Sequence, residues 1–144
     1  MKRKIVSLLF VLLSLFTMVF AACEKEIGSP AQFGLEVVSI TETEVVLLGK
    51  GNSTGRLSDG MELLKEGGKL TYETSGGMVT SINGKANAAD WSASWMLYTS
   101  DEEMANTEWG TYEYNGETLG SAIVGAESLF VASGEFYIWV YQSF

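Results

Sequence analysis

Two Asn-Gly pairs, at positions 83–84 and 115–116, are the sequence feature that most restricts the possible folds of this chain of 144 residues. Each pair follows a run in which apolar and polar residues alternate, at 78–82 and at 108–114. Asn-Gly is the strongest short hairpin signal, because both positions tolerate a positive φ. Alternation with a period of two is typical of strands that bury one face. The two pairs therefore predict antiparallel hairpins in the second half of the chain.

Further strands are predicted from runs rich in β-branched and aromatic residues. In the last run, alternation places Phe136, Ile138 and Val140 on one side and Tyr137, Trp139 and Tyr141 on the other. The segment 120–125 is predicted to be a turn and packing segment, since its small residues permit close backbone approach. The remaining strand runs are 35–40, 44–48, 94–99, 117–121, 128–131 and 135–142, with a loop at 49–55.

One short helix is predicted at 58–68. Asp59 can cap its first turn, with Glu62 three residues later completing a capping-box pattern. Leu57, Met61 and Leu64 can share one face, and Gly67 can supply the left-handed stop. A helix of about two turns must pack on something to persist. The expected fold class is therefore α+β, a small mostly antiparallel sheet with one short packed helix.

The first 22 residues form a basic start followed by an apolar run at 5–22, which is typical of a secretory signal peptide. The length of this apolar run alone does not exclude a membrane-spanning helix. Ala21, Ala22 and Cys23 resemble a bacterial lipobox, in which the cysteine becomes the lipidated first residue, although Phe20 departs from the usual pattern. We expect a lipoprotein signal peptide at 1–22, lipidated Cys23 with a tether at 23–34, and one domain at 35–144.

Charge and residue types exclude several function classes. Residues 23–144 contain six lysines and arginines against 18 acids, a formal net charge of −12. This negative net charge would repel the phosphate backbone of a nucleic acid, so binding to nucleic acid is not expected. The chain has no histidine, which removes the usual general base and the commonest metal ligand, and its single cysteine precludes an internal disulfide. We therefore expect a non-enzymatic protein with no metal site.

From position 57 to 144 the chain resembles the transcobalamin-like C-terminal domain family, which is common in bacterial lipoproteins. In vertebrate cobalamin carriers the similar domain is the smaller half of a clamp around the corrinoid. The larger half, an α-helical barrel, has no counterpart in residues 23–144. The resemblance implies a small α+β domain and cobalamin or another corrinoid as ligand. It is carried by the segments at 61–64, 78–84, 95–98, 120–125 and 133–141.

The aromatic residues of the last 54 positions are the candidate binding groups, since an exposed face of Trp and Tyr can stack on a flat ligand. The alternative is that they form the core of a small domain. Trp95 and Trp139 are expected in or beside that core. Trp91, in a Gly/Ala/Asn-rich loop, is the best candidate for exposure. The candidate ligand-binding residues are Trp91, Tyr98, Trp109 and Tyr114.

Together these features predict an extracytoplasmic lipoprotein anchored to the bacterial cell membrane through Cys23. Its domain is expected to bind a small flat ligand such as a corrinoid, as an uptake component that works with a transporter or surface protein. The alternative is a surface adhesion or protein-interaction module. No cofactor and no nucleic-acid partner are expected.

Overall fold

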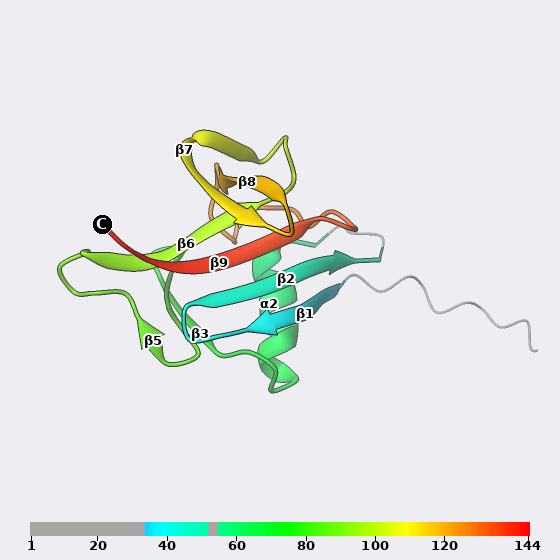
Figure 1. Ribbon diagram of the computed structural model, residues 1–144. Coiled ribbons are helices and arrows are strands. Elements are labelled where there is room, and N and C mark those ends of the chain that lie inside the picture. The colour runs from blue at the N-terminus through cyan, green and yellow to red at the C-terminus, as the bar shows by residue number, and fades with distance from the viewer. Residues whose placement is uncertain (1–33, 52–54) are drawn as a thin grey trace, which may run out of the picture. The chain divides into compact units, whose positions relative to one another are not determined.

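The computed structural model describes residues 34–51 and 55–144, which fall within one compact unit, Gln32–Phe144. Its main feature is a six-stranded sheet with the strand order β1-β2-β9-β6-β8-β7 (Figure 1). Every neighbouring pair in it is antiparallel. The strands are β1 (Gly34–Ile40), β2 (Glu44–Lys50), β6 (Ala93–Thr99), β7 (Ala105–Tyr114), β8 (Glu117–Ala122) and β9 (Phe136–Ser143).

A second, three-stranded antiparallel sheet and one helix complete the described elements. The small sheet has the order β3-β4-β5, and the helix, α2, runs behind β1 and β2 in Figure 1. These elements confirm the expected α+β class, with mostly antiparallel strands and one short helix. Their bounds are α2 (Leu57–Glu66), β3 (Tyr72–Ser75), β4 (Met78–Ile82) and β5 (Lys85–Ala86).

Both Asn-Gly pairs form the predicted turns. Asn83 and Gly84 have φ angles of 48° and 80°, and Asn115 and Gly116 have φ angles of 50° and 82°. Two consecutive positive φ angles match the twist of the flanking strands, so each pair closes a tight hairpin. The turns join β4 to β5 and β7 to β8.

The helix begins one residue earlier in the sequence than predicted, and its capping residues have roles other than the predicted ones. Arg56 is the N-cap, and its backbone N–H donates to Oδ2 of Asp59 at 2.9 Å. Asp59 is therefore the third residue of the helix rather than its cap. Gly67 has a right-handed φ of −76°, whereas Gly68 has a φ of +69°, so the left-handed stop lies one residue later than expected.

The main core lies on one face of the six-stranded sheet. The predicted helix face is confirmed, since Leu57, Met61 and Leu64 are buried there. Tyr137 and Trp139 of β9 belong to the same cluster. Burial of such side chains supplies most of the stabilisation of a small domain, at roughly 25 cal/mol for each Å² of apolar surface removed from water.

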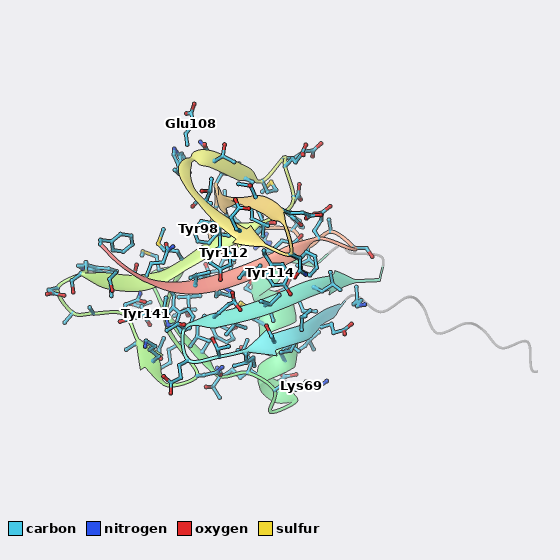
Figure 2. All side chains as sticks on the ribbon, in the orientation of Figure 1. Lys69, Tyr98, Glu108, Tyr112, Tyr114 and Tyr141 are labelled. Atoms are coloured by element: carbon cyan, nitrogen blue, oxygen red, sulfur yellow. The ribbon has the colours of Figure 1, made fainter. Side chains whose placement is uncertain are left out.

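A second core lies on the opposite face of the sheet, where the β7–β8 hairpin folds over β9. Figure 2 shows Tyr98, Tyr112 and Tyr114 in the space between this hairpin and β9. The Tyr112 hydroxyl donates to a carboxylate oxygen of Glu44 on β2. A register shift in the β7–β8 ladder between Asn106 and Thr111 bends the hairpin. The buried members of this cluster are Val46, Tyr98, Leu119, Ile138 and Val140.

Some strand predictions are wrong in detail. The predicted loop at 49–55 begins later, because Gly49 and Lys50 continue β2. The predicted strand at 128–131 is reduced to a single bridge between Arg56 and Phe130. The strand β3 was not predicted, and β5, the short strand that follows the predicted turn at Asn83–Gly84, was not given bounds. The signal peptide at 1–22, Cys23 and the tether up to residue 33 lie outside the described residues, and Gly34 already belongs to β1. Among the described residues no helix has the length and hydropathy of a membrane span.

Candidate functional site: a groove at the edge of β6

Tyr98, one of the four predicted ligand-binding residues, belongs to the interior. Its side chain is only 3% exposed, and its hydroxyl donates to Oε1 of Gln142 at 2.7 Å. Its ring also packs on Tyr112, with centroids 5.6 Å apart. The expectation that Tyr98 is exposed is wrong, because the β7–β8 hairpin covers the sheet face that would otherwise have formed a stacking platform.

Tyr114 is half-buried in the same second core. Its ring meets that of Phe136 edge-on, at a centroid distance of 5.1 Å. This geometry is the one that aromatic pairs favour within a core. Tyr114 therefore has a packing role that its place in the sequence did not reveal.

Trp91 and Trp109 are exposed, at 58% and 64% of their surface, as predicted. Trp91 lies in the turn before β6 and has a φ of 62°, an uncommon conformation for a bulky residue. Two hydrogen bonds from Ser92 to Asp90 hold this turn and lower the pKa of the Asp90 carboxyl. Trp109 lies on β7 in the bulged part of that strand, next to Glu108, which projects away from the body in Figure 2. The two residues therefore belong to different elements.

The sheet has a gap beside β6 that residue types alone do not show. β6 pairs with β9 along its whole length, from Ala93 to Thr99. On its other side it pairs with β8 only at Tyr98 and Thr99. The N–H of Trp95 in this stretch donates to Asn87, and the N–H of Leu97 takes part in the ladder at Tyr98 and Ser121, so the outward-facing donors of β6 already have partners.

A groove of about 310 Å³ lies along this unpaired stretch, which we call the β6 groove. Apolar side chains form most of its walls, and the exposed side chains of Met78 and Ile123 stand on its rim. Its volume is at the lower end of the range of ligand pockets. The lining residues are Gly77, Met78 and Val79; Trp95, Met96 and Leu97; residues 121–126; and Trp139.

Asn87 fixes one end of the β6 groove. Its Oδ1 accepts a hydrogen bond from the backbone N–H of Trp95 at 2.9 Å, and its Nδ2 donates to the carbonyl of Val79 at 3.1 Å. The side-chain amide thus bridges β4 and β6 as a short piece of strand would. Trp95 is further held by its Nε1, which donates to the carbonyl of Lys85 at 2.7 Å.

Trp139, in the wall of the β6 groove, has an unpaired indole donor. Its side chain is 5% exposed, and its Nε1 has no hydrogen-bond partner. Among the described residues it is the one buried side-chain nitrogen or oxygen in this state. A buried donor left unpaired costs about 1–3 kcal/mol.

Acidic charge lies at one end of the β6 groove. Glu127 approaches the β3–β4 turn so closely that a Cβ on Gly77 would lie 3.1 Å from its Oε2. The ammonium group of Lys85 lies 4.4 Å from the centre of the Tyr141 ring. No group of three or more potential metal-ligating side chains occurs in residues 34–51 and 55–144. The β6 groove therefore suits a neutral or cationic occupant.

Sequence reasoning identified the walls of this site but not the site itself. Trp95 and Trp139 were correctly placed in or beside the core. The prediction of a turn and packing segment at 120–125 is confirmed for the close packing at Gly120, but the turn is wrong for residues 120–122, which belong to β8. The missing partner of Trp139 Nε1 and the short β6–β8 ladder depend on how distant segments meet, which one sequence does not record. Comparison of the chain with protein-family models, curated proteins and solved structures gave no match.

Proposed function

We propose that this protein is a non-enzymatic binding module whose binding site is the β6 groove. The observation that carries the proposal is the concave groove of about 310 Å³ beside β6, whose walls are mostly apolar and include the side chains of Trp95 and Trp139. Ligand sites are typically concave and mostly apolar, with a few polar groups that fix orientation. The β6 groove fits this description, and its occupant would be a mostly apolar group.

We also propose that the module is an extracytoplasmic lipoprotein, anchored to the bacterial membrane through Cys23. Its support is the sequence of residues 1–23, with a basic start, an apolar run and Ala-Ala-Cys at its end. In bacterial cells grown with radioactive palmitate, the wild-type protein should become labelled and Cys23→Ser should not. Absence of label on the wild type, or equal label on the variant, would contradict the lipid anchor.

A corrinoid is a less suitable occupant of the β6 groove alone. The resemblance to the transcobalamin-like family supports it, but a groove of about 310 Å³ can take only the edge or a side group of so large a ligand. Uptake of a corrinoid would therefore need a second protein to cover the rest. The protein-interaction alternative is favoured by the exposed apolar side chains of Met78 and Ile123 beside the β6 groove.

Tryptophan fluorescence of the full chain in detergent micelles tests the binding function. The background is a Trp91→Phe/Trp109→Phe variant, in which Trp95 and Trp139 are the only tryptophans. The probes are cyclohexanol, cobinamide and the capped pentapeptide Lys-Ala-Thr-Ala-Lys. We expect a saturable change with at least one probe, at a Kd between roughly micromolar and millimolar.

A matched pair of substitutions locates the response. Met78 on the groove rim and Leu63 on α2 are 55% and 53% exposed. Met78→Ala should weaken binding several-fold, whereas Leu63→Ala should leave it unchanged. The absence of a saturable response to all three probes would contradict the proposed function, as would equal effects of the two substitutions.

A further inference from the structure

We propose that Asn115, at the tip of the β7–β8 hairpin, is a site of spontaneous covalent modification. There the folded protein would lose ammonia and gain an aspartyl or isoaspartyl residue, whereas Asn83, in a turn of the same sequence, would react several-fold more slowly. The inference concerns the β7–β8 hairpin and goes beyond the binding function proposed for the β6 groove.

The reaction needs only the Asn-Gly pair and water. The backbone nitrogen of Gly116 attacks Cγ of Asn115 and forms a five-membered succinimide ring, while its proton leaves with the side-chain NH₂ group as ammonia. Water then opens the ring at one of its two carbonyls. One opening leaves an aspartyl residue, and the other leaves an isoaspartyl residue, whose backbone runs through the side-chain carbon. Glycine favours the attack because it has no Cβ beside its nitrogen.

The two reacting groups of the β7–β8 turn are not held by hydrogen bonds. The turn holds only Asn115 and Gly116 between β7 and β8, and both residues are exposed. Among the described residues, no backbone hydrogen bond of a turn or loop uses the N–H of Gly116. The side-chain hydrogen bond at this end of the hairpin joins Thr118 to Glu113 and leaves the carboxamide of Asn115 unbonded. A Cβ added to Gly116 would meet nothing within 4 Å, so the Asn115 side chain has room to rotate.

The turn at Asn83 has the same sequence, similar φ angles and the same exposure, but its asparagine is bonded. Oδ1 of Asn83 accepts from the backbone N–H of Thr71 at 2.9 Å and from its Oγ1 at 3.4 Å. The backbone N–H of Asn83 donates to the Thr71 carbonyl at 2.8 Å. Rotation of the carboxamide towards the nitrogen of Gly84 would break the bonds to Oδ1, so the attack has a higher barrier than at Asn115.

The charges beside the two turns act in the opposite direction. Lys85 follows Gly84, whereas Glu117 follows Gly116 and Glu113 lies on the same hairpin. A positive neighbour favours loss of the proton from the backbone nitrogen, and a negative neighbour opposes it. Salt at about 1 M shortens the Debye length to about 3 Å and screens most of this effect. A comparison of the two sites at that salt concentration therefore isolates the hydrogen bonds to Asn83.

The two products differ in their effect on the β7–β8 hairpin. Its turn depends on consecutive positive φ angles at Asn115 and Gly116, which match the twist of the strands. An isoaspartyl residue inserts an additional carbon into the backbone there and removes this match, whereas an aspartyl residue only adds a negative charge. The hairpin covers the second core, in which Leu119 is 1% exposed. The isoaspartyl product should therefore loosen that core.

Incubation of the full chain in detergent micelles, in mildly alkaline buffer with about 1 M sodium chloride, tests the inference. Peptide mapping by chromatography and mass spectrometry assigns each product to its residue, and the released ammonia is measured in parallel. The same incubation in concentrated guanidinium chloride gives the rates of the two sites in the unfolded chain. The matched variants are Asn115→Gly and Asn83→Gly, because Gly-Gly also suits a two-residue hairpin turn.

In the folded chain, aspartyl and isoaspartyl products should form at Asn115 several-fold faster than at Asn83, and Asn115→Gly should lower the ammonia release more than Asn83→Gly. In guanidinium chloride the two sites should react at similar rates, because the bonds to Thr71 are absent. Equal rates in the folded chain would overturn the inference, as would a several-fold difference that persists in guanidinium chloride. Formation of product at Asn115 only in the unfolded chain would also overturn it.

Urea unfolding of the separated isoaspartyl form tests the effect on the hairpin. Asn115→Asp is the control, since it carries the same added charge on an unaltered backbone. We expect a lower urea midpoint for the isoaspartyl form and a midpoint close to that of the wild type for Asn115→Asp. Equal midpoints for the isoaspartyl form and Asn115→Asp would overturn the loosening of the second core.

Discussion

Asn87 and Trp95 are joined by a hydrogen bond of 2.9 Å from the backbone N–H of Trp95 to the side-chain oxygen of Asn87. This bond ends the open stretch of β6 and ties it to β4, whose Val79 carbonyl accepts from the same amide. Together with the bond from Nε1 of Trp95 to the Lys85 carbonyl, the Asn87 amide holds β6 against the small sheet at this end of the β6 groove.

Replacement of Asn87 by alanine should destabilise the domain by about 1–3 kcal/mol, because it leaves a partly buried N–H and a carbonyl without partners. Urea unfolding measures this loss. Asn106 is the matched control, since its Oδ1 accepts from the N–H of Glu108 in an exposed local turn. Asn106→Ala should cost clearly less, and equal costs for the two variants would contradict the bridging role of Asn87.

The two tryptophans of the β6 groove should differ in their response to loss of the indole nitrogen. Both are 5% exposed, but Nε1 of Trp95 donates to Lys85 whereas Nε1 of Trp139 has no partner. Trp95→Phe should therefore cost about 1 kcal/mol more in unfolding free energy than Trp139→Phe. Chemical denaturation of both variants checks this, and the reverse order would show that Trp139 has a bonded donor.

Tyr112 should make stability depend on alkaline pH. Its hydrogen bond to Glu44, together with burial, raises the pKa of Tyr112 to about 12. The unfolded chain loses this proton near the ordinary pKa of about 10, so the contribution is complete below pH 10 and is lost as the pH rises towards 12. Tyr112→Phe should lower stability at pH 8 by about 0.5–1.5 kcal/mol. It should also reduce the loss between pH 10 and 12.

Tyr72 limits how much Tyr112→Phe can reduce the loss of stability between pH 10 and 12. Burial, followed by its hydrogen bond to Glu62, raises the pKa of Tyr72 to about 12 as well. A Tyr72→Phe/Tyr112→Phe variant should therefore show a smaller alkaline loss than either single variant. If Tyr112→Phe keeps the full wild-type slope of stability against pH, the Tyr112–Glu44 bond does not exist in solution.

The opposite placements of Tyr98 and Trp91 predict opposite effects of truncation. Tyr98→Ala should cost about 3–5 kcal/mol, the range for a large aromatic removed from a core. Trp91→Ala should change stability by about 0.5 kcal/mol or less, as is usual at exposed positions. Thermal or urea unfolding distinguishes the two. A small effect of Tyr98→Ala would mean that the β7–β8 hairpin does not cover this face.

The faces of the strands could be predicted from the sequence because side chains alternate along a strand. Tyr137 and Trp139 lie in the main core and Ile138 and Val140 in the second, as alternation requires. The elements that cover each face of the six-stranded sheet could not be predicted. Burial of Tyr98 follows from the bend in the β7–β8 hairpin, which arises from a bulge and not from the composition of β6.

Turns were predictable where the residue pair itself favours positive φ, as at Asn83 and Asn115. The helix cap was misplaced because Asp59 can accept a backbone hydrogen bond either as the cap or three residues inside it. The β6 groove was not predictable, since it depends on where the β6–β8 pairing stops.

The indole N–H signal of Trp139 in a ¹H–¹⁵N spectrum of the full chain in micelles tests the central claim most directly. Trp139→Phe assigns this signal among those of the four tryptophans. On addition of a probe that binds the wild type, the account predicts a saturable shift of this signal, while the signals of exposed Trp91 and Trp109 stay in place. A Trp139 signal that does not move at millimolar concentrations of any of the three probes, or one that moves equally in Met78→Ala, would contradict binding in the β6 groove.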